Sequence, residues 1–294
     1  MRMKTKIVHP SVLIKLGHTL ERLHKHWIFH LSPDRLHFTI SKTDFNTGVQ
    51  VWAQLGTETL FEDYKIESVS DNHIWLEVKG DHLLRALKSG QKSVQMIMRL
   101  SKKQGLPVLS FTITNQSRIG KLIILVQDVP VRVISPDKTH EFREPATPDF
   151  DVHILMPPIL SVRNIAERMK AVGQRLVISA NMSGQLTMGV SNDIVKIQTF
   201  FKDLINPILD PVQVDVLTCA STNRNKAEFA EVEVDIRDFI KFVQCYQLHP
   251  SKILCCINEQ SCLIFYVVMG DDDESDTLDD RSGSLTYRIP LRTK

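Results

Sequence analysis

The sequence predicts an α+β protein built from two copies of one domain, with largely antiparallel sheets and four helices. The order strand, helix, strands, helix, strands runs twice along the 294 residues. Short motifs also recur between the halves, because residues 31–36 align with 181–186 at an offset of 150 and residues 76–78 align with 232–234 at an offset of 156. Internal repetition on this scale indicates a duplicated fold.

The repeat divides the chain into two domains and a connector. Residues 1–135 form the first domain, residues 136–149 the connector, and residues 150–294 the second domain with an acidic loop at 271–280. The connector holds three prolines, several charges and few apolar residues, which favours an extended segment. The length is comfortable for two hydrophobic cores.

Apolar residues at spacings of three and four predict the four helices. In the first helix Leu13, Leu16 and Leu20 share a face, and Ser11 after Pro10 is a candidate N-cap. The expected helices span about residues 11–26, 81–91, 159–172 and 236–248. The expected strands are 6–8, 27–31, 36–40, 49–55, 60–66, 74–78, 94–100, 108–113, 122–126 and 131–134, then 152–155, 176–180, 185–190, 196–201, 231–234, 253–257, 262–269 and 285–289.

Composition and motifs exclude several classes of protein. No apolar run reaches the ~20 residues that a membrane span needs, so we expect no membrane partner. The glycine-rich, metalloprotease and nucleophile-elbow motifs of common enzymes are missing, and we expect a protein without catalysis. We also expect no cofactor and no metal, because the five cysteines form no C-x-x-C pair and the histidines at 18, 24 and 26 are interleaved with cations.

The charge is divided unevenly between the two halves. Residues 1–135 carry 19 Lys and Arg against 11 Asp and Glu, whereas the remainder carries 17 against 23. The split suggests a basic face for a polyanion and an acidic element elsewhere. The acidic element is the loop at 271–280, in which Ser275 and Thr277 are candidate phosphorylation sites. An unmodified solvated insertion is the simpler explanation of such a loop.

Each predicted helix carries basic side chains opposite its apolar stripe. Lys and Arg distributed in this way neutralise phosphates without reading base edges, which favours duplex DNA bound without sequence preference. One such stripe is ordinary solvation of a helix face, and four at repeated positions make DNA binding an equal alternative without deciding between the two. The candidate DNA-facing residues are Lys15, Arg22, Lys25, Arg85, Lys88, Lys92, Arg163, Lys170, Arg237 and Lys241.

Several segments spread over nearly the whole chain carry a family resemblance. They include LSPDRLHF at 31–38, IWLEV at 74–78, QDVPVRVI at 127–134, EPATPD at 144–149 and AEVEVDIR at 230–237. Together with the repeat and the basic helices, they resemble the sliding DNA clamps, and within that family the Hus subunit of the heterotrimeric 9-1-1 checkpoint clamp. The long acidic loop and the histidine-rich first helix depart from the family pattern.

The resemblance implies a fold and a role. In this family, similar to proliferating cell nuclear antigen, antiparallel sheets form the outside of a ring and the helices line its inner face. It implies two other clamp subunits as partners, a clamp loader, double-stranded DNA, and checkpoint and repair factors, in the nucleus with some protein in the cytoplasm. The alternative is a homotrimeric replication processivity clamp.

A ring also requires open strand edges at both ends of each subunit. We expect residues 108–113 or a neighbouring strand to form one edge, and residues 262–269 the other.

Overall fold

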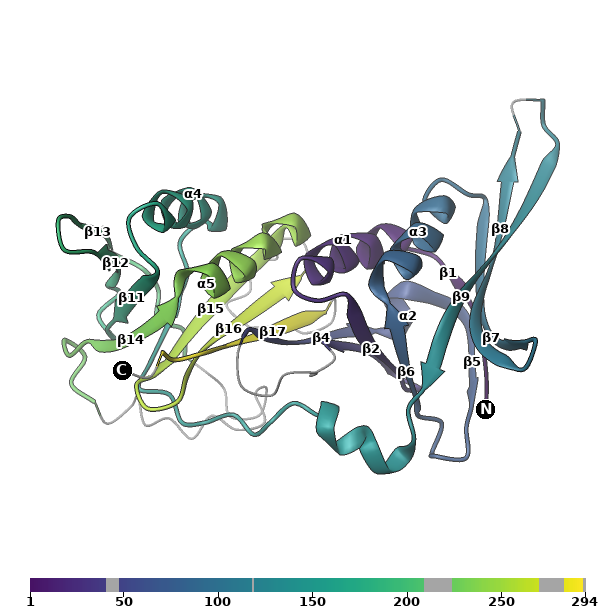
Figure 1. Ribbon diagram of the computed structural model, residues 1–294, viewed down its shortest axis with the longest axis horizontal. Coiled ribbons are helices and arrows are strands. Elements are labelled where there is room, and N and C mark those ends of the chain that lie inside the picture. Colours follow the sequence, from purple (N-terminus) through teal and green to yellow (C-terminus); the bar gives the residue numbers. More distant parts are fainter. Residues whose placement is uncertain (41–47, 118, 209–223, 270–282, 293–294) are drawn as a thin grey trace. The chain divides into compact units, whose positions relative to one another are not determined.

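The computed structural model divides the chain into two compact units (Figure 1). It describes residues 1–40, 48–117, 119–208, 224–269 and 283–292. The first unit consists mainly of residues 1–40 and 52–143, and the second mainly of residues 144–269 and 284–292. Serine 275, threonine 277 and the rest of the acidic loop lie outside the described residues.

The first unit is a curved sheet with helices on one face. Its helices are α1 (Pro10–Glu21), the short α2 (Thr57–Leu60) and α3 (Gly80–Gly90). Its strands are β1 (Arg2–Ile7), β2 (His26–Leu31), β3 (Arg35–Ile40), β4 (Gln50–Gly56), β5 (Phe61–Glu67), β6 (Ile74–Lys79), β7 (Gln95–Lys103), β8 (Leu106–Gln116) and β9 (Leu122–Val133).

The second unit repeats this plan. Its helices are α4 (Ile159–Lys170) and α5 (Ile236–Val243), and α5 continues into the 3-10 helix η3 (Gln244–Leu248). Its strands are β10 (Val152–Leu155), β11 (Arg175–Ala180), β12 (Leu186–Ser191), β13 (Lys196–Phe201), β14 (Ala230–Asp235), β15 (Pro250–Asn258), β16 (Cys262–Met269) and β17 (Ser284–Pro290).

The strand order confirms the predicted duplication and the antiparallel sheets. The order β4-β3-β2-β6 in the first unit corresponds to β13-β12-β11-β14 in the second, and β9-β8-β7-β1 corresponds to β17-β16-β15-β10. In both units a helix precedes the central hairpin and another follows the strand that pairs with it. The first unit adds β5 beside β1 and joins its two halves where Leu76–Val78 pairs with Val131–Val133.

Close helix packing in the first unit depends on two glycines. A methyl group at Gly17 of α1 would lie 2.5 Å from the Leu84 side chain of α3, so the glycine allows these helices to approach. A methyl group at Gly80 would lie 2.4 Å from the indole of Trp27, which is 1% exposed. The Trp27 indole also donates a hydrogen bond to the carbonyl of His24 at 2.9 Å. Side chains on α1, β2 and α3 therefore form one well-packed core.

The first helix is shorter than the sequence predicted. It begins with Pro10 in its first turn after His9, so the expected N-cap at Ser11 was wrong. It ends at Glu21 instead of near residue 26. The backbone N–H of His26 donates to the ring of His24 at 3.1 Å, and these local bonds stabilise a turn in place of further helix.

Two other segments differ from expectation in their helical form. The helix expected over 236–248 changes to 3-10 geometry after Val243 and ends at His249, whose φ of 51° is left-handed. The connector was expected to be extended throughout, but Pro136–Phe142 forms the 3-10 helix η1. The Trp52 indole of the first unit donates to the carbonyl of Phe142 at 3.3 Å, which ties the end of η1 to that unit.

Candidate nucleic-acid interface and strand edges

In the first unit, the candidate DNA-facing residues lie on or just after α1 and α3, which pack side by side. Lys15, Arg22 and Lys25 are exposed, and none forms an ion pair with a described residue. Lys15 is on α1, Arg22 is its C-cap, and Lys25 lies in the following turn. Lys88 and Lys92 are exposed at the end of α3 and beyond it. This helix pair therefore presents several unpaired cations.

Arg85 differs from its neighbours because it is already paired. Its guanidinium donates to the carboxylate of Asp81, one turn earlier on α3, at 2.8 Å. Partial burial opposes ionisation of Asp81, but the Arg85 hydrogen bond and the nearby His82 and Lys79 outweigh it and lower the carboxyl pKa. The Asp81 charge therefore offsets part of the positive charge that Arg85 brings to this face.

The second unit offers fewer unpaired cations. Lys170 and Arg237 are exposed, whereas Lys241 contacts Asp238 on its own helix at 2.7 Å. Arg163 on α4 is only partly exposed, and its guanidinium carbon lies 4.4 Å from the centre of the Tyr246 ring of η3. That arrangement is a cation–π contact between two elements of this unit.

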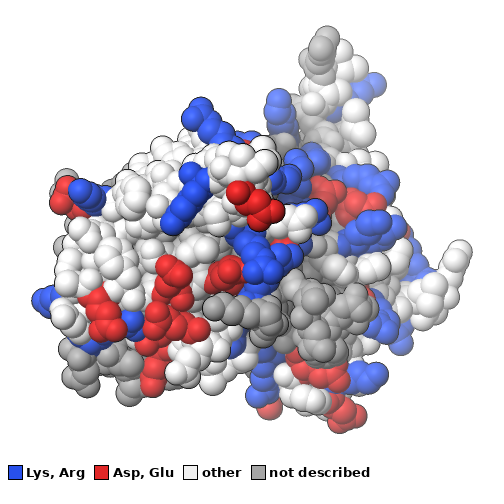
Figure 2. Space-filling model, turned by 60° about the vertical axis from the view of Figure 1, so that its left-hand side comes forward, with Lys and Arg blue, Asp and Glu red and all other residues white. Residues whose placement is uncertain are grey.

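Charge is mixed over the surface. Figure 2 shows Lys and Arg interspersed with Asp and Glu over the face that it presents.

The spacing of Asp81 with Arg85 and of Asp238 with Lys241 could have predicted both ion pairs, because residues three or four apart on a helix are neighbours. The Arg163–Tyr246 contact joins residues 83 positions apart and leaves no such signal in the sequence.

The strands expected to form open edges are interior strands. β8 pairs with β7 on one side and β9 on the other, and β16 pairs with β15 and β17. The prediction for residues 108–113 and 262–269 was therefore wrong, although the neighbour allowed for in the first unit, β9, does have an open side. Most residues of β16 are buried, and β8 is buried over residues 108–111 and at Ile113.

β9 has an open edge over much of its length. Its residues 122–130 pair with β8, but within the described chain its other side is paired only where Val131–Val133 meets β6. The five residues Leu122–Val126 are consecutive and apolar, and each is at least 39% exposed. Since successive strand residues point to opposite faces, both faces of this strand segment are exposed. Such an apolar edge is typical of a protein–protein contact.

β13 is the corresponding edge in the second unit. Among described strands it pairs only with β12, and its Phe200 side chain is 64% exposed. Ile194, just before the strand, is 91% exposed. The two units thus each expose a strand edge with apolar side chains.

A histidine cluster covers part of the outer face of β2, β3 and β6. The His30 ring stacks on the Trp75 indole with centroids 3.8 Å apart, and its Nε2 lies 2.9 Å from Nδ1 of His73. Burial lowers the pKa of His30 to about 3, with contributions from His37, His73 and Arg143. The rings stack instead of converging, and no group of three or more possible metal ligands occurs in the described part of the chain.

Four of the five cysteines lie in the core of the second unit: Cys245, Cys255, Cys256 and Cys262 are free thiols and at most 1% exposed. Burial raises the thiol pKa of Cys245 and Cys255. The fifth, at position 219, lies outside the described residues.

Of the described helices, none is long and apolar enough to cross a membrane.

Comparison with known proteins gives consistent matches over the whole chain. A family model described as Hus1-like protein matches residues 1–292. The checkpoint protein hus1 of Schizosaccharomyces pombe is 33% identical over 290 residues, covering 98% of both chains. Checkpoint protein HUS1 of Homo sapiens is 31% identical and covers 92% of this chain and 96% of its own, and a Dictyostelium discoideum homologue is 30% identical over the full length of both.

A solved structure shows the fold. The crystal structure of PCNA from Thermococcus kodakaraensis superposes with a TM-score of 0.68 and covers 99% of this chain and 100% of its own. At 15% identity it shows the shared fold alone. The fold is a sliding-clamp fold, as the sequence predicted.

Proposed function

Because this chain belongs to the Hus1-like family, we propose that it is one subunit of a heterotrimeric checkpoint ring that encircles DNA at sites of damage. The observation that carries the proposal is the family match over residues 1–292 on a chain with the clamp fold. The ring serves as a platform for checkpoint signalling and repair factors, and it performs no catalysis of its own. A clamp loader places it on DNA in the nucleus, with some of the protein in the cytoplasm.

We further propose that each clamp domain corresponds to one of the two units, at 1–135 and 150–294, with 136–149 as the connector. The open edges of β9 and β13 support contacts with two other clamp subunits, because each edge leaves backbone hydrogen-bonding groups available to a partner strand. The exposed apolar side chains of Leu122–Val126 would be buried by such a partner.

The DNA-facing surface draws on the ten predicted cations, which do not all contact phosphate. Seven of them lack an ion-pair partner among the described residues and are the strongest candidates for phosphate contacts. They are Lys15, Arg22, Lys25, Lys88, Lys92, Lys170 and Arg237. Arg85 and Lys241 share their charge with a carboxylate, and Arg163 packs on an aromatic ring.

The native mass of the purified chain tests this proposal. Analytical ultracentrifugation should show mainly monomer for the chain alone, and one heterotrimer when the two partner subunits are added. A charged substitution in the open edge, Ile124→Lys, should abolish the heterotrimer, whereas Leu106→Lys, an exposed apolar residue of β8, should leave it intact. A stable homotrimer at micromolar concentration would instead establish the replication-type clamp.

A further inference from the structure

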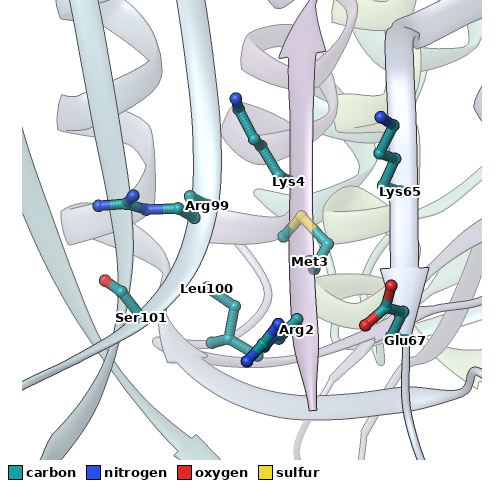
Figure 3. Close-up of a pocket in the computed structure, with 8 residues that line it drawn as sticks. All are labelled: Arg2, Met3, Lys4, Lys65, Glu67, Arg99, Leu100 and Ser101. Atoms are coloured by element: carbon teal, nitrogen blue, oxygen red, sulfur yellow. The ribbon is translucent and has the colours of Figure 1, made fainter.

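A basic hollow lies on the outer face of β5, β1 and β7 in the first unit. Its volume is about 400 Å³, and its polar lining comprises Arg2, Lys4, Lys65, Arg99, Glu67 and Ser101 (Figure 3). Four cationic side chains and one carboxylate thus line it. Lys4 and Lys65 extend in the same direction from neighbouring strands. Arg99 and Ser101 lie on the side of Lys4 away from Lys65, and the Arg99 side chain extends away from Lys4.

The strand register places like charges directly opposite one another. Lys4 of β1 is paired with Lys65 of β5 on one side and with Arg99 of β7 on the other. Directly opposed residues of antiparallel strands lie on one face with neighbouring Cβ atoms, so like charges there destabilise the sheet. Three opposed cations are therefore unfavourable unless an anion lies among them.

Other cations of the same sheet face have partners. Lys6, two residues along β1, contacts Glu62 at 2.6 Å, and Lys103 of β7 pairs with Asp128 of β9. By contrast, Lys4 and Lys65 form no ion pair with any residue in the described ranges. The sheet thus neutralises the cations around the hollow. Within the hollow it leaves Lys4 and Lys65 available, whereas Arg99 interacts electrostatically with Asp128.

A second observation concerns Ser101. Its hydroxyl oxygen is buried and has no hydrogen-bond partner among the residues that the structure describes. A buried hydroxyl without a hydrogen-bond partner is unfavourable, so an acceptor oxygen placed beside it would stabilise it. The hollow therefore combines unpaired cations with an unsatisfied donor.

The hollow is separate from the candidate DNA-facing helices. On β7, Met96 and Met98 are buried, and Met96 lies against Gly90 at the end of α3. Since residues alternate between the faces of a strand, Arg99 projects from the face away from α3. Met3, Thr5 and Ile7 of β1 are likewise buried, so Lys4 projects from that same outer face.

We propose that this hollow binds a phosphorylated serine or threonine in a segment of a partner protein. A phosphate monoester carries about −1.5 to −2 charges and three acceptor oxygens, which match the unpaired cations and the Ser101 hydroxyl. The volume suits a compact group rather than a duplex, and Glu67 would repel the continuous phosphate track of DNA. Arg99 supplies a guanidinium, the group best suited to bidentate contact with phosphate.

Fluorescence anisotropy with the free full-length chain tests the proposal independently of ring assembly. The probe is a labelled nine-residue peptide with a central phosphoserine between glutamates, compared with its unphosphorylated twin, inorganic phosphate and a 20-base-pair duplex. The phosphopeptide should bind saturably and at least about tenfold more tightly than its twin, and added salt should weaken it. Inorganic phosphate should compete with the phosphopeptide for the hollow. The duplex should not displace the phosphopeptide.

Substitutions then locate the site. Lys4→Gln with Lys65→Gln should weaken phosphopeptide binding about tenfold or more, whereas the matched pair Lys121→Gln with Lys138→Gln, exposed lysines of the same unit, should have no effect. Arg99→Gln provides an independent variant if the double substitution alters the fold, which circular dichroism would detect. Equal affinity for the two peptides, unchanged affinity in the Lys4/Lys65 variant, or efficient displacement by the duplex would each overturn the proposal.

Discussion

Arg163 tests whether all ten candidate cations are available to contact DNA. Its guanidinium carbon lies 4.4 Å from the centre of the Tyr246 ring, which holds the charge within the protein. Cation–π contacts extend to about 6 Å and contribute about 0.5–1 kcal/mol when exposed and about 2 kcal/mol when desolvated. Arg163 is partly exposed and its Nε is buried without a hydrogen-bond partner in the described chain. We therefore expect a coupling energy near 1 kcal/mol between the two side chains.

A double-mutant cycle measures this coupling directly. The variants are Arg163→Met, Tyr246→Leu and the combination, and the measurement is the free energy of unfolding in urea. Met keeps most of the apolar stem of Arg163, so the cycle isolates the contact of the charge with the ring. A coupling energy indistinguishable from zero would show that the guanidinium does not depend on the ring for its position.

The same variant also tests the DNA-facing surface. In the assembled ring, each phosphate contact contributes about −0.9 to the slope of log affinity against log salt. Arg237→Met should therefore make the slope shallower by about 0.9, whereas Arg163→Met should leave it unchanged. If both substitutions change the slope equally, Arg163 leaves its ring to contact DNA and the structural distinction between them fails.

Three further outcomes follow from the packing and the charges. Gly17→Ala should reduce stability in urea by about 1–3 kcal/mol because its methyl group overlaps Leu84, and Leu84→Ala should recover part of that loss rather than add to it. Stability should fall as the pH drops from about 6.5 toward 3, because folding holds the His30 pKa low and the unfolded chain takes up the proton first. His30→Gln should flatten this dependence on pH, and an unchanged profile would exclude His30 as its source. Lys4→Gln should raise the melting temperature slightly by relieving the repulsion from Lys65, whereas a lower melting temperature would argue against that repulsion.

Periodicity and repetition predicted the fold well, since both depend on local pattern. The three-and-four spacing of Leu13, Leu16 and Leu20 reflects which side chains are buried. In β2 burial does not alternate strictly, because Ile28 is buried together with Trp27 and Phe29. The end of α1 could not be placed because Leu23 and Trp27 continue the helical spacing. Hydrogen bonds within the turn at His24 and His26 override that pattern.

Strand neighbours and long-range contacts were harder to predict from the sequence. The apolar composition of β16 suits either an edge that docks a partner or a strand paired on both sides, and only the register distinguishes them. The hollow at Lys4, Lys65 and Arg99 draws on three strands, with Lys65 61 positions after Lys4 and Arg99 34 positions after Lys65. Its cations come together only when β1 is placed between β5 and β7.

The confinement of every cysteine to residues 219–262 gives this protein a built-in stability reporter. After Cys219→Ser, the four remaining thiols are all buried in the second unit, and the first unit has none. A thiol reagent can then modify the protein only as fast as that unit opens, because buried groups exchange with solvent through local or global unfolding. The labelling rate therefore measures how one half of a duplicated protein opens, and a partner that slows labelling protects that half.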